Sequence, residues 1–425
     1  MCGALLLIAA LSAWRPLFGH PPPDDAVAAP VTASPAVSPA ERAAAPTPQP
    51  ATPAPLPTPS LRSATIRSVG DFLIHDELLE AAYDKAAKVY DFAPMLVHAV
   101  PYLEDADYTV ANVDGVLKGG KADGFPRFSV PTALLDAIKG AGIDMLTLAN
   151  NHTMDYGFQG LVATIENCER YGLDFVGAAR SAEERDTPVV VAVNGIQVGF
   201  LNYAQHSNRK PPAAVRGYAM SMMAGANYAR DIAALRTDGA DVVVVYTHWG
   251  AEYQASPDRN QRNHAKKLAA AGADVIIGGH PHMVQPCAWI EATGAGGEAR
   301  RALCMYSLGN FLAGKRTEAR DTGVVFEFTI QETESGLFEI VSPRYMPTYT
   351  VKLKANSKYR VLACADWMDH PAPAMNRAEQ AKVVRAWKYL NKLLGHKVAQ
   401  PMQTQYAEQT GGETAAPDRG DGSDA

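Results

Sequence analysis

The sequence predicts an α/β protein that contains a mixed β-sheet. Between residues 61 and 396, short β-branched runs alternate with amphipathic stretches that are long enough to form helices. Two of the runs flank Asn194-Gly195, a pair that is typical of a two-residue hairpin turn. Strands that alternate with helices favour parallel pairing, whereas a hairpin adds an antiparallel pair, so we expect both kinds of pairing in one folded domain.

The expected elements follow from hydrophobic periodicity and from residues that start or stop helices. Ser256, Pro257 and Asp258 are interpreted as the N-cap and first two positions of a helix that Gly272 ends. We expect strands at residues 64–69, 108–113, 142–148, 188–193, 196–203, 241–247, 273–277, 324–330 and 337–341, and helices at residues 77–88, 131–140, 156–171, 228–236, 256–272 and 376–394.

The two ends of the chain differ in composition from its middle. Residues 1–19 contain an apolar run, which is too short for a comfortable membrane span but resembles the hydrophobic part of a secretory signal or membrane anchor. Residues 20–60 are rich in Pro and Ala and predict a disordered, extended linker, and residues 397–425 predict a disordered tail. We therefore expect an exported domain at the cell surface, with membrane contact through its N-terminus. A cytosolic phosphatase with a misassigned start is the weaker alternative.

Charge and cysteine content narrow the function classes. The formal net charge is −6 and the chain has no long basic run, so nucleic acid is not an expected partner. Five cysteines do not decide the compartment. Cys287 and Cys304 flank a Gly-rich turn, and an antiparallel hairpin there places them opposite each other. A cross-strand disulfide and two free thiols both remain open.

Polar side chains with the chemistry of metal ligands follow several of the predicted strands. Ligands bind at the carboxyl ends of strands in open α/β folds, so these side chains are expected to meet. Mixed carboxylate, amide and imidazole groups suit borderline ions such as Mn, Fe or Zn, and the absence of cysteine among them argues against a structural zinc site. The candidates are Asp71, Asp114, Asn151, His152, His248, His280 and His282, with His75 and Glu252 as further options.

Such a set is a common way to build a two-metal hydrolytic centre. An Asp bridges two ions about 3.5–4 Å apart, while Asn and His complete the ligands on either side. One ion polarises the scissile group, and a metal-activated water attacks it. His152, next to Asn151 but pointing elsewhere, is then placed to protonate the leaving group.

Six motifs resemble those of the capsule-synthesis CapA family of poly-γ-glutamate systems, which is similar in fold to calcineurin-like metallophosphoesterases. They occur in family order between about residues 66 and 361. They are Val69-Gly70-Asp71, Asn112-Val113-Asp114-Gly115, Leu148-Ala149-Asn150-Asn151-His152 with Asp155-Tyr156-Gly157, His248-Trp249-Gly250-Ala251-Glu252-Tyr253, Gly278-Gly279-His280-Pro281-His282 with Gln285-Pro286, and Tyr306-Ser307-Leu308-Gly309-Asn310-Phe311.

The resemblance implies a metallophosphatase-like sandwich of mixed β-sheets flanked by helices, with two divalent ions. It makes Asp71, Asp114, Asn151, His248, His280 and His282 the metal ligands, His152 the acid, with Asp71 and Glu252 also among the catalytic residues. Two departures stand out. Asp114 occupies a position where the family usually has Glu. The Asp-x-His opening of metallophosphoesterases is absent because Phe72 and Leu73 follow Asp71, and His75 is the only nearby substitute.

Two functions are compatible with these observations. The first is a cell-surface, divalent-metal-dependent hydrolase or transferase that acts on an anionic polymer, either poly-γ-glutamate or another envelope component, or on a phosphoester. The second is a non-catalytic subunit for assembly or export of the capsule polymer, because a fold does not by itself imply an activity.

Overall fold

The computed structural model describes residues 60–314 and 319–404. The predicted signal or anchor segment and nearly all of the predicted linker lie outside the described residues, as does the tail from residue 405. Residues 397–404, which we assigned to the tail, form part of the fold: β17 (Gln400–Pro401) pairs with β15, and Met402 is buried. Among the described residues, no helix combines the length and the apolar character that a membrane span requires.

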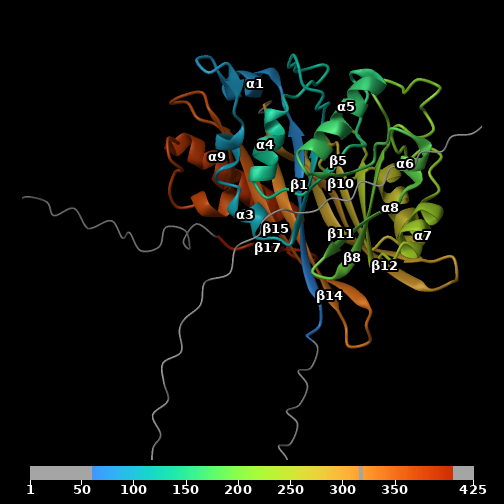
Figure 1. The fold of residues 1–425 in the computed structure, drawn as a ribbon. Coiled ribbons are helices and arrows are strands. Elements are labelled where there is room, and N and C mark those ends of the chain that lie inside the picture. Colours follow the sequence, from blue (N-terminus) through green and yellow to red (C-terminus); the bar gives the residue numbers. More distant parts are fainter. Residues whose placement is uncertain (1–59, 315–318, 405–425) are drawn as a thin grey trace, which may run out of the picture. The chain divides into compact units, whose positions relative to one another are not determined.

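Two β-sheets pack face to face and carry helices on their outer sides (Figure 1). This arrangement confirms the predicted sandwich of mixed β-sheets. In the described residues the first sheet contains β1 (Ser63–Leu73), β4 (Tyr108–Val113), β5 (Met145–Thr147), β6 (Asp174–Val176), β13 (Asn310–Ala313), β14 (Thr322–Glu332), β15 (Phe338–Lys352), β16 (Tyr359–Ala363) and β17. The second contains β7 (Val189–Val193), β8 (Ile196–Ala204), β9 (Val242–His248), β10 (Val275–Gly279), β11 (Val284–Thr293) and β12 (Ala299–Leu308).

The parallel strands lie next to one another in each sheet. The first sheet runs β16-β15-β14-β1-β4-β5-β6, and β1, β4, β5 and β6 are mutually parallel. The second runs β11-β12-β10-β9-β8-β7, and β8, β9, β10 and β12 are parallel. β14 is antiparallel to β1 within the first sheet, and the hairpins β14-β15, β15-β16, β11-β12 and β7-β8 add further antiparallel pairs. The central strands are buried on both faces, which explains why β9 is an uninterrupted β-branched run.

The core between the sheets is made of alternate residues on their inner faces. Ile66 and Val110 of the first sheet pack with Val244 and Ile277 of the second, and none is more than 1% exposed. Removing an aliphatic side chain of this size from water stabilises the fold by about 1.5–3 kcal/mol. The parallel strands are thereby held in a fixed position relative to one another, and so are the residues at their ends.

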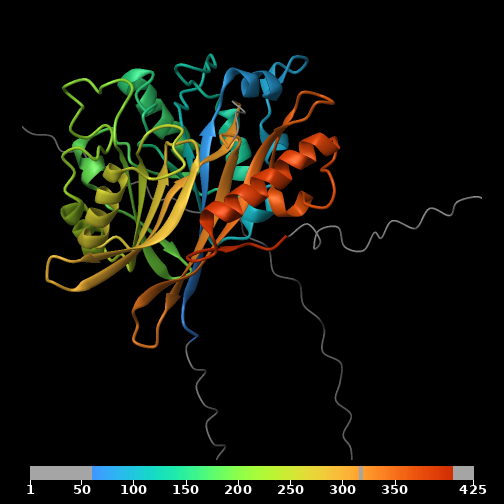
Figure 2. The same ribbon diagram turned by 180° about the vertical axis from the view of Figure 1, so that it is seen from behind.

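Helices cover the outer faces of both sheets. Apolar residues of α4 and α5 pack on the first sheet, and those of α7 and α8 on the second. α9 lies across the side seen in Figure 2 and contacts both β15 and β11. The helices are α1 (Asp76–Ala82), α2 (Ala93–Leu96), α3 (Pro101–Glu104), α4 (Ala133–Gly140), α5 (Gly157–Arg170), α6 (Ala182–Asp186), α7 (Tyr228–Thr237), α8 (Arg259–Ala271) and α9 (Arg377–Leu394), with a 3₁₀ turn η1 (Cys364–Trp367).

Two helix predictions were wrong in their bounds. The helix expected to run to residue 88 ends at Ala82, and a small hairpin of β2 (Tyr83–Asp84) and β3 (Val89–Tyr90) follows. The Asp84 carboxylate accepts hydrogen bonds from two backbone N–H groups of the turn, which stabilises that turn in place of another helical turn. α8 is capped by Asp258, not Ser256, because Asp258 and Gln261 form a reciprocal capping box.

The two hairpins had different outcomes. The turn at Asn194-Gly195 is confirmed, with φ angles of 48° and 77° at its two residues. The second hairpin also forms, but Cys287 lies opposite Met305 and not opposite Cys304. A shift of one residue turns side chains to opposite faces, so the two thiols enter different hydrophobic clusters. Both cysteines are free and buried, and the proposed disulfide is wrong for this structure.

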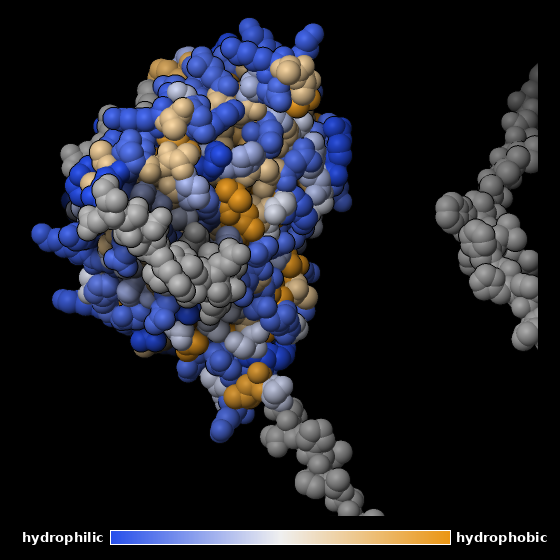
Figure 3. All heavy atoms as spheres, turned by 90° about the vertical axis from the view of Figure 1, so that its left-hand side faces the viewer, coloured by the Kyte–Doolittle hydropathy of each residue, from blue (hydrophilic) through white to orange (hydrophobic). Residues whose placement is uncertain are grey.

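The face of the molecule shown in Figure 3 is mainly hydrophilic. Hydrophobic residues appear there in small separate groups, which is ordinary for a protein surface.

Candidate metal centre

Parallel strands of both sheets deliver polar residues to one end of the sandwich. The strand β1 carries Asp71 near its carboxyl end, and β9 ends at His248. The other candidates follow directly after their strands: Asp114 after β4, Asn151 and His152 after β5, and His280 and His282 after β10. All seven are buried, with exposed fractions of 8% or less. The structure therefore brings together the residues that we predicted as metal ligands.

The first part of this cluster joins two carboxylates to an imidazole. His282 Nδ1 lies 3.2 Å from Asp71 Oδ2, and Asn112 Nδ2 donates to Asp71 Oδ1 over 2.8 Å. The two oxygens of Asp114 each lie 3.9 Å from an imidazole Nε2, one of His248 and one of His282. Neither oxygen of Asp114 has a hydrogen-bond partner within the described residues, although its side chain is fully buried.

The second part brings two imidazoles and an amide to the same place. His248 Nε2 lies 2.7 Å from Asn151 Oδ1 and 3.1 Å from His280 Nδ1. The backbone N–H of His280 donates to Asp71 Oδ2 over 3.3 Å, which connects this group to the first. Oxygen and nitrogen atoms from both sheets thus converge in one buried volume.

The backbone around the two histidines after β10 is unusual. His280 and His282 have φ angles of 93° and 54°, in the left-handed region that residues other than Gly rarely adopt. Each such residue costs on the order of 1–3 kcal/mol, and strain of this kind gathers at functional sites. The preceding Gly279 passes close to Asp71, whose Oδ1 would lie only 3.0 Å from a Cβ at that position.

Burial and neighbouring charges shift the pKa values of the cluster residues in different directions. Burial, together with neighbouring imidazoles, lowers the pKa of His248 well below its usual value and that of His280 to about 3. Burial raises the pKa of Asp114 to about 6. Burial also opposes the charging of His282, but its hydrogen bond to Asp71 and the charges nearby raise its pKa to about 9. His248 and His280 are therefore neutral at pH 7, the form in which imidazole binds metal ions.

His152 lies beside this convergence and forms a hydrogen-bonded pair with Asp155. Its Nδ1 lies 2.7 Å from Asp155 Oδ2, and that oxygen also accepts a hydrogen bond from the backbone N–H of Phe128. The Phe128 ring packs edge-on against the imidazole at 4.7 Å. Burial lowers the pKa of His152, but the charge of Asp114 and the bond to Asp155 outweigh it, and the net direction is upward.

Glu252 differs from the other candidates because it is exposed. One of its carboxylate oxygens nevertheless lies within 4.8 Å of ring nitrogens of both His280 and His282. Glu252 therefore stands at the rim of the centre, next to Tyr253, whose ring lies 6.2 Å from that of His282.

Four residues of the site were missed as functional candidates. Asn112 orients Asp71, and Asp155 orients His152. Asn208 lies beside the His152 ring, and the ring of His206 packs against His280 at a centroid distance of 4.7 Å. Position after a strand end was the available signal for His206, since it follows β8 at the same edge of the second sheet.

The residues present fit a divalent ion. Asp71, Asn112 and His248 line a small void of about 20 Å³, which is enough for one water-sized particle. The buried oxygens of Asp114 have no hydrogen-bond partner among the described residues, which suits a carboxylate that binds a cation. The donor set of carboxylate, amide and neutral imidazole suits Mn, Fe or Zn.

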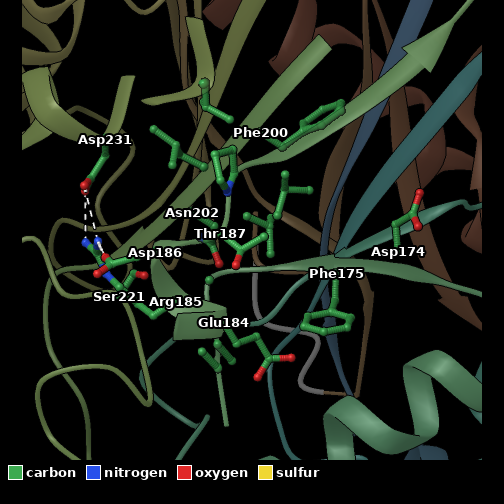
Figure 4. A pocket seen from close by; sticks show the side chains of 18 of the residues that line it. Asp174, Phe175, Glu184, Arg185, Asp186, Thr187, Phe200, Asn202, Ser221 and Asp231 are labelled. Carbon is green, nitrogen blue, oxygen red and sulfur yellow. Dashed lines mark hydrogen bonds and ion pairs between the residues drawn. The ribbon is translucent and has the colours of Figure 1, made fainter. Parts of the chain in front are cut away.

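A much larger cavity of about 1080 Å³ lies elsewhere and contains none of the predicted ligands. It opens between β6, α6 and α7, and Figure 4 shows Asp231 bonded to Arg185 on its wall. Asp231 also accepts hydrogen bonds from Tyr203 and Arg230. The carboxylate of Asp231 is therefore neutralised by the protein itself.

The fold and the cluster define an α/β sandwich with a buried carboxylate–imidazole centre at the carboxyl ends of its parallel strands. Residues 65–315 match the family described as bacterial capsule synthesis protein PGA_cap, and the chain belongs to this family. It is 29% identical over 290 residues to the capsule biosynthesis protein CapA of Bacillus anthracis, a match that covers 65% of this chain and 66% of that protein. It is 27% identical over 289 residues to the PGA biosynthesis protein CapA of Bacillus subtilis, covering 67% and 73%.

Solved structures show weaker likenesses. A calcineurin-like phosphoesterase, YfkN of Bacillus subtilis, is 17% identical and has a TM-score of 0.40, with 78% of this chain and all of that chain covered. The NAD nucleotidase of Haemophilus influenzae is 13% identical with a TM-score of 0.41, covering 82% and 66%. The family assignment rests on the family match and not on these structures.

Proposed function

We propose that this protein is an extracytoplasmic, divalent-metal-dependent hydrolase or transferase that acts on an anionic capsule or envelope polymer of the poly-γ-glutamate type. The observation that carries the proposal is the convergence of Asp71, Asp114, His248 and His282, in which the fully buried Asp114 carboxylate has no hydrogen-bond partner among the described residues. Membership of the capsule-synthesis family supports the polymer class. The apolar and Pro-rich N-terminal composition supports export.

Six residues would hold the ions: Asp71, Asp114, Asn151, His248, His280 and His282. When bound, the ions would supply positive charge that polarises the scissile carbonyl or phosphoryl group. The neutral state of His248 and His280 keeps their ring nitrogens free to act as ligands. Burial of the cluster keeps bulk water away, so the charges inside it act on one another at short range.

His152 would move the proton. Asp155 holds its Nδ1, and the backbone N–H of Phe128 holds Asp155 in turn, so the imidazole has a fixed orientation. Its raised pKa means that it carries a proton near pH 7 more readily than a free histidine does. A protonated imidazole beside the ions is placed to donate to the leaving group.

The test is to compare parent protein, His152→Ala and His264→Ala after loading with Mn, Fe or Zn. His264 is a matched control because it is a helical histidine hydrogen-bonded to Tyr228, outside the centre. Substrates are a γ-linked glutamate oligomer and a phosphate ester. We expect His152→Ala to keep its metal, measured by elemental analysis, and to lose turnover by about 10²–10⁴-fold. Unchanged turnover in this variant contradicts the acid role of His152.

The competing function is a non-catalytic subunit for polymer assembly or export. It predicts that Asp71→Ala and His280→Ala leave capsule formation intact in cells, whereas deletion of residues 61–361 abolishes it. The enzymatic proposal predicts that both alanine variants fail in the same complementation experiment. Metal-loaded parent protein that turns over neither substrate favours the competing function.

A further inference from the structure

We infer that Arg320, stacked on Tyr253 at the rim of the metal centre, is a specificity-determining residue that receives an anionic group of the substrate. The inference rests on the proposed function, because it gives the substrate a second point of contact beside the same centre. It concerns two residues that none of the predicted ligand or catalytic roles includes.

The position of Arg320 is fixed through the backbone. The side chain of Asn310 is buried, and its Oδ1 lies 3.0 Å from His282 Nδ1. The Nδ2 of the same amide donates to the carbonyl oxygen of Arg320 over 2.8 Å. One buried amide thus connects a predicted metal ligand to the backbone of Arg320, so the arginine and the centre keep a constant separation.

The side chain of Arg320 is fixed by an aromatic surface. Its guanidinium carbon lies 3.4 Å from the centroid of the Tyr253 ring, which is close contact between the planar group and the ring face. Tyr253 is itself held in place, because its N–H donates to the carbonyl oxygen of Pro281 over 2.7 Å. Its φ of 65° shows that the chain accepts an unfavourable conformation to present this ring.

The guanidinium N–H groups of Arg320 have no carboxylate partner among the described residues and can bind an anion of the substrate. Within the described residues, its guanidinium forms no ion pair with a carboxylate and no side-chain hydrogen bond. Yet Tyr253 is 40% exposed, so the stacked pair borders solvent. Stacking restrains the side chain without using its N–H groups, which leaves a preorganised fork that matches a carboxylate or a phosphate.

The location relative to His282 gives the arginine its role. The Tyr253 ring lies 6.2 Å from the His282 ring, so Arg320, stacked on Tyr253, borders the same side of the centre as His282. A substrate with a charged group next to the bond that reacts satisfies both contacts at once. A γ-linked glutamate polymer carries such a carboxylate at every residue, and a phosphate ester carries the charge on the reacting group itself.

The experiment measures binding to metal-loaded protein by calorimetry with three probes. They are a γ-linked glutamate oligomer, the same oligomer with its α-carboxylates converted to amides, and inorganic phosphate. The variants are Arg320→Ala, Arg320→Lys, Tyr253→Ala and Tyr253→Phe. Arg301→Ala is the matched control, because Arg301 also stacks on an aromatic ring, Trp289, at the other end of β12 from the centre.

We expect Arg320→Ala to weaken binding of the carboxylate oligomer by about 10-fold or more and to leave the amide oligomer unaffected. Arg320→Lys restores little, because an ammonium group provides neither the fork nor the same stacking. Tyr253→Ala weakens binding and Tyr253→Phe does not, since the phenyl ring keeps the platform. If Arg320→Ala weakens the binding of inorganic phosphate but not of the carboxylate oligomer, Arg320 contacts the reacting phosphoryl group of a substrate. This result overturns the proposed contact with a carboxylate.

Two outcomes separate this inference from the proposed function. If the parent protein binds and turns over the carboxylate oligomer, and Arg320→Ala behaves like Arg301→Ala, the role of Arg320 is wrong and the proposed function stands. If the metal-loaded parent binds neither oligomer, the polymer substrate is wrong and the role of Arg320 falls with it. Where turnover is measurable, a rise in KM at constant kcat is expected for Arg320→Ala.

Discussion

Asp114 and Asp231 are both aspartates in buried polar clusters, but their surroundings are opposite. Asp231, on the wall of the large cavity, is 7% exposed and accepts hydrogen bonds from Arg185, Tyr203 and Arg230. Asp114 is 0% exposed, and within the described residues its oxygens have no hydrogen-bond partner. The described chain therefore satisfies the hydrogen-bonding capacity of the Asp231 carboxylate but not that of the Asp114 carboxylate.

The difference distinguishes a structural network from a binding centre. Burying a charge without hydrogen bonds costs several kcal/mol, so the carboxylate of Asp114 suits a position at which a bound cation would compensate it. The pKa directions agree with this distinction. Burial raises the pKa of Asp114 to about 6, whereas hydrogen bonds outweigh burial at Asp231 and lower its pKa. The volume of a cavity does not identify the candidate binding centre in this protein, because the larger cavity lies beside the hydrogen-bonded Asp231 network.

The largest expected effect is on metal binding. Asp114→Asn should weaken the binding of Mn or Zn by more than about 100-fold, because it removes a charged ligand and not only a group that orients one. Asp231→Asn should leave binding unchanged. Isothermal calorimetry on chelator-treated protein measures both. Equal affinity in parent and Asp114→Asn contradicts the role of Asp114 as a ligand.

The second effect is on stability in metal-free protein. Asp231→Ala should lower the free energy of unfolding by about 2–3 kcal/mol, because it leaves Arg185 and Tyr203 without their acceptor. Asp114→Asn should not lower it, since the variant removes a buried charge that has no hydrogen-bond partner among the described residues. Urea denaturation in the presence of a chelator measures the two changes. A large loss of stability in Asp114→Asn indicates a hidden internal partner and removes the contrast between the two clusters.

The smallest effect is the pH dependence of the Asp231 network. Burial raises the pKa of Asp231, but the bonds from Arg185, Tyr203 and Arg230 lower it further than burial raises it, to below the ordinary 3.8. The folded pKa is thus below the unfolded one, so the stabilisation is fully present above about pH 4 and is lost as the pH falls through the folded pKa. The stability difference between parent and Asp231→Asn should therefore be constant from pH 5 to 7 and shrink in acid. A difference that grows in acid reverses this assignment.

Much of the fold and of the candidate centre could be predicted from the sequence, and the reason is local. β-branched runs define buried strands, and polar residues directly after such strands must lie at one edge of the sheet. Asp71, Asn151 and His248 were found in this way. His206 and Asn208 were not, although His206 lies just after β8, because no motif linked this loop to the other candidates.

Register and turn bonding account for the remaining errors. The sheet face on which the Cys287 side chain lies depends on the conformation of the β11–β12 turn. In this turn the Gly294 N–H donates to the carbonyl oxygen of Glu298. That choice shifts the pairing by one residue, and composition does not determine it. Likewise, the Asp84 carboxylate ends a helix that propensity alone would extend. In both cases hydrogen bonds within a turn accompany a local structure that composition does not determine.

The direction of β1 also fixes which end of the sandwich carries the candidate metal centre. The strand begins at Ser63 and reaches Asp71 eight residues later, a distance of roughly 26 Å at the usual rise of an extended chain. Ser63, where β1 begins, therefore lies at the end of the sandwich remote from the candidate metal centre.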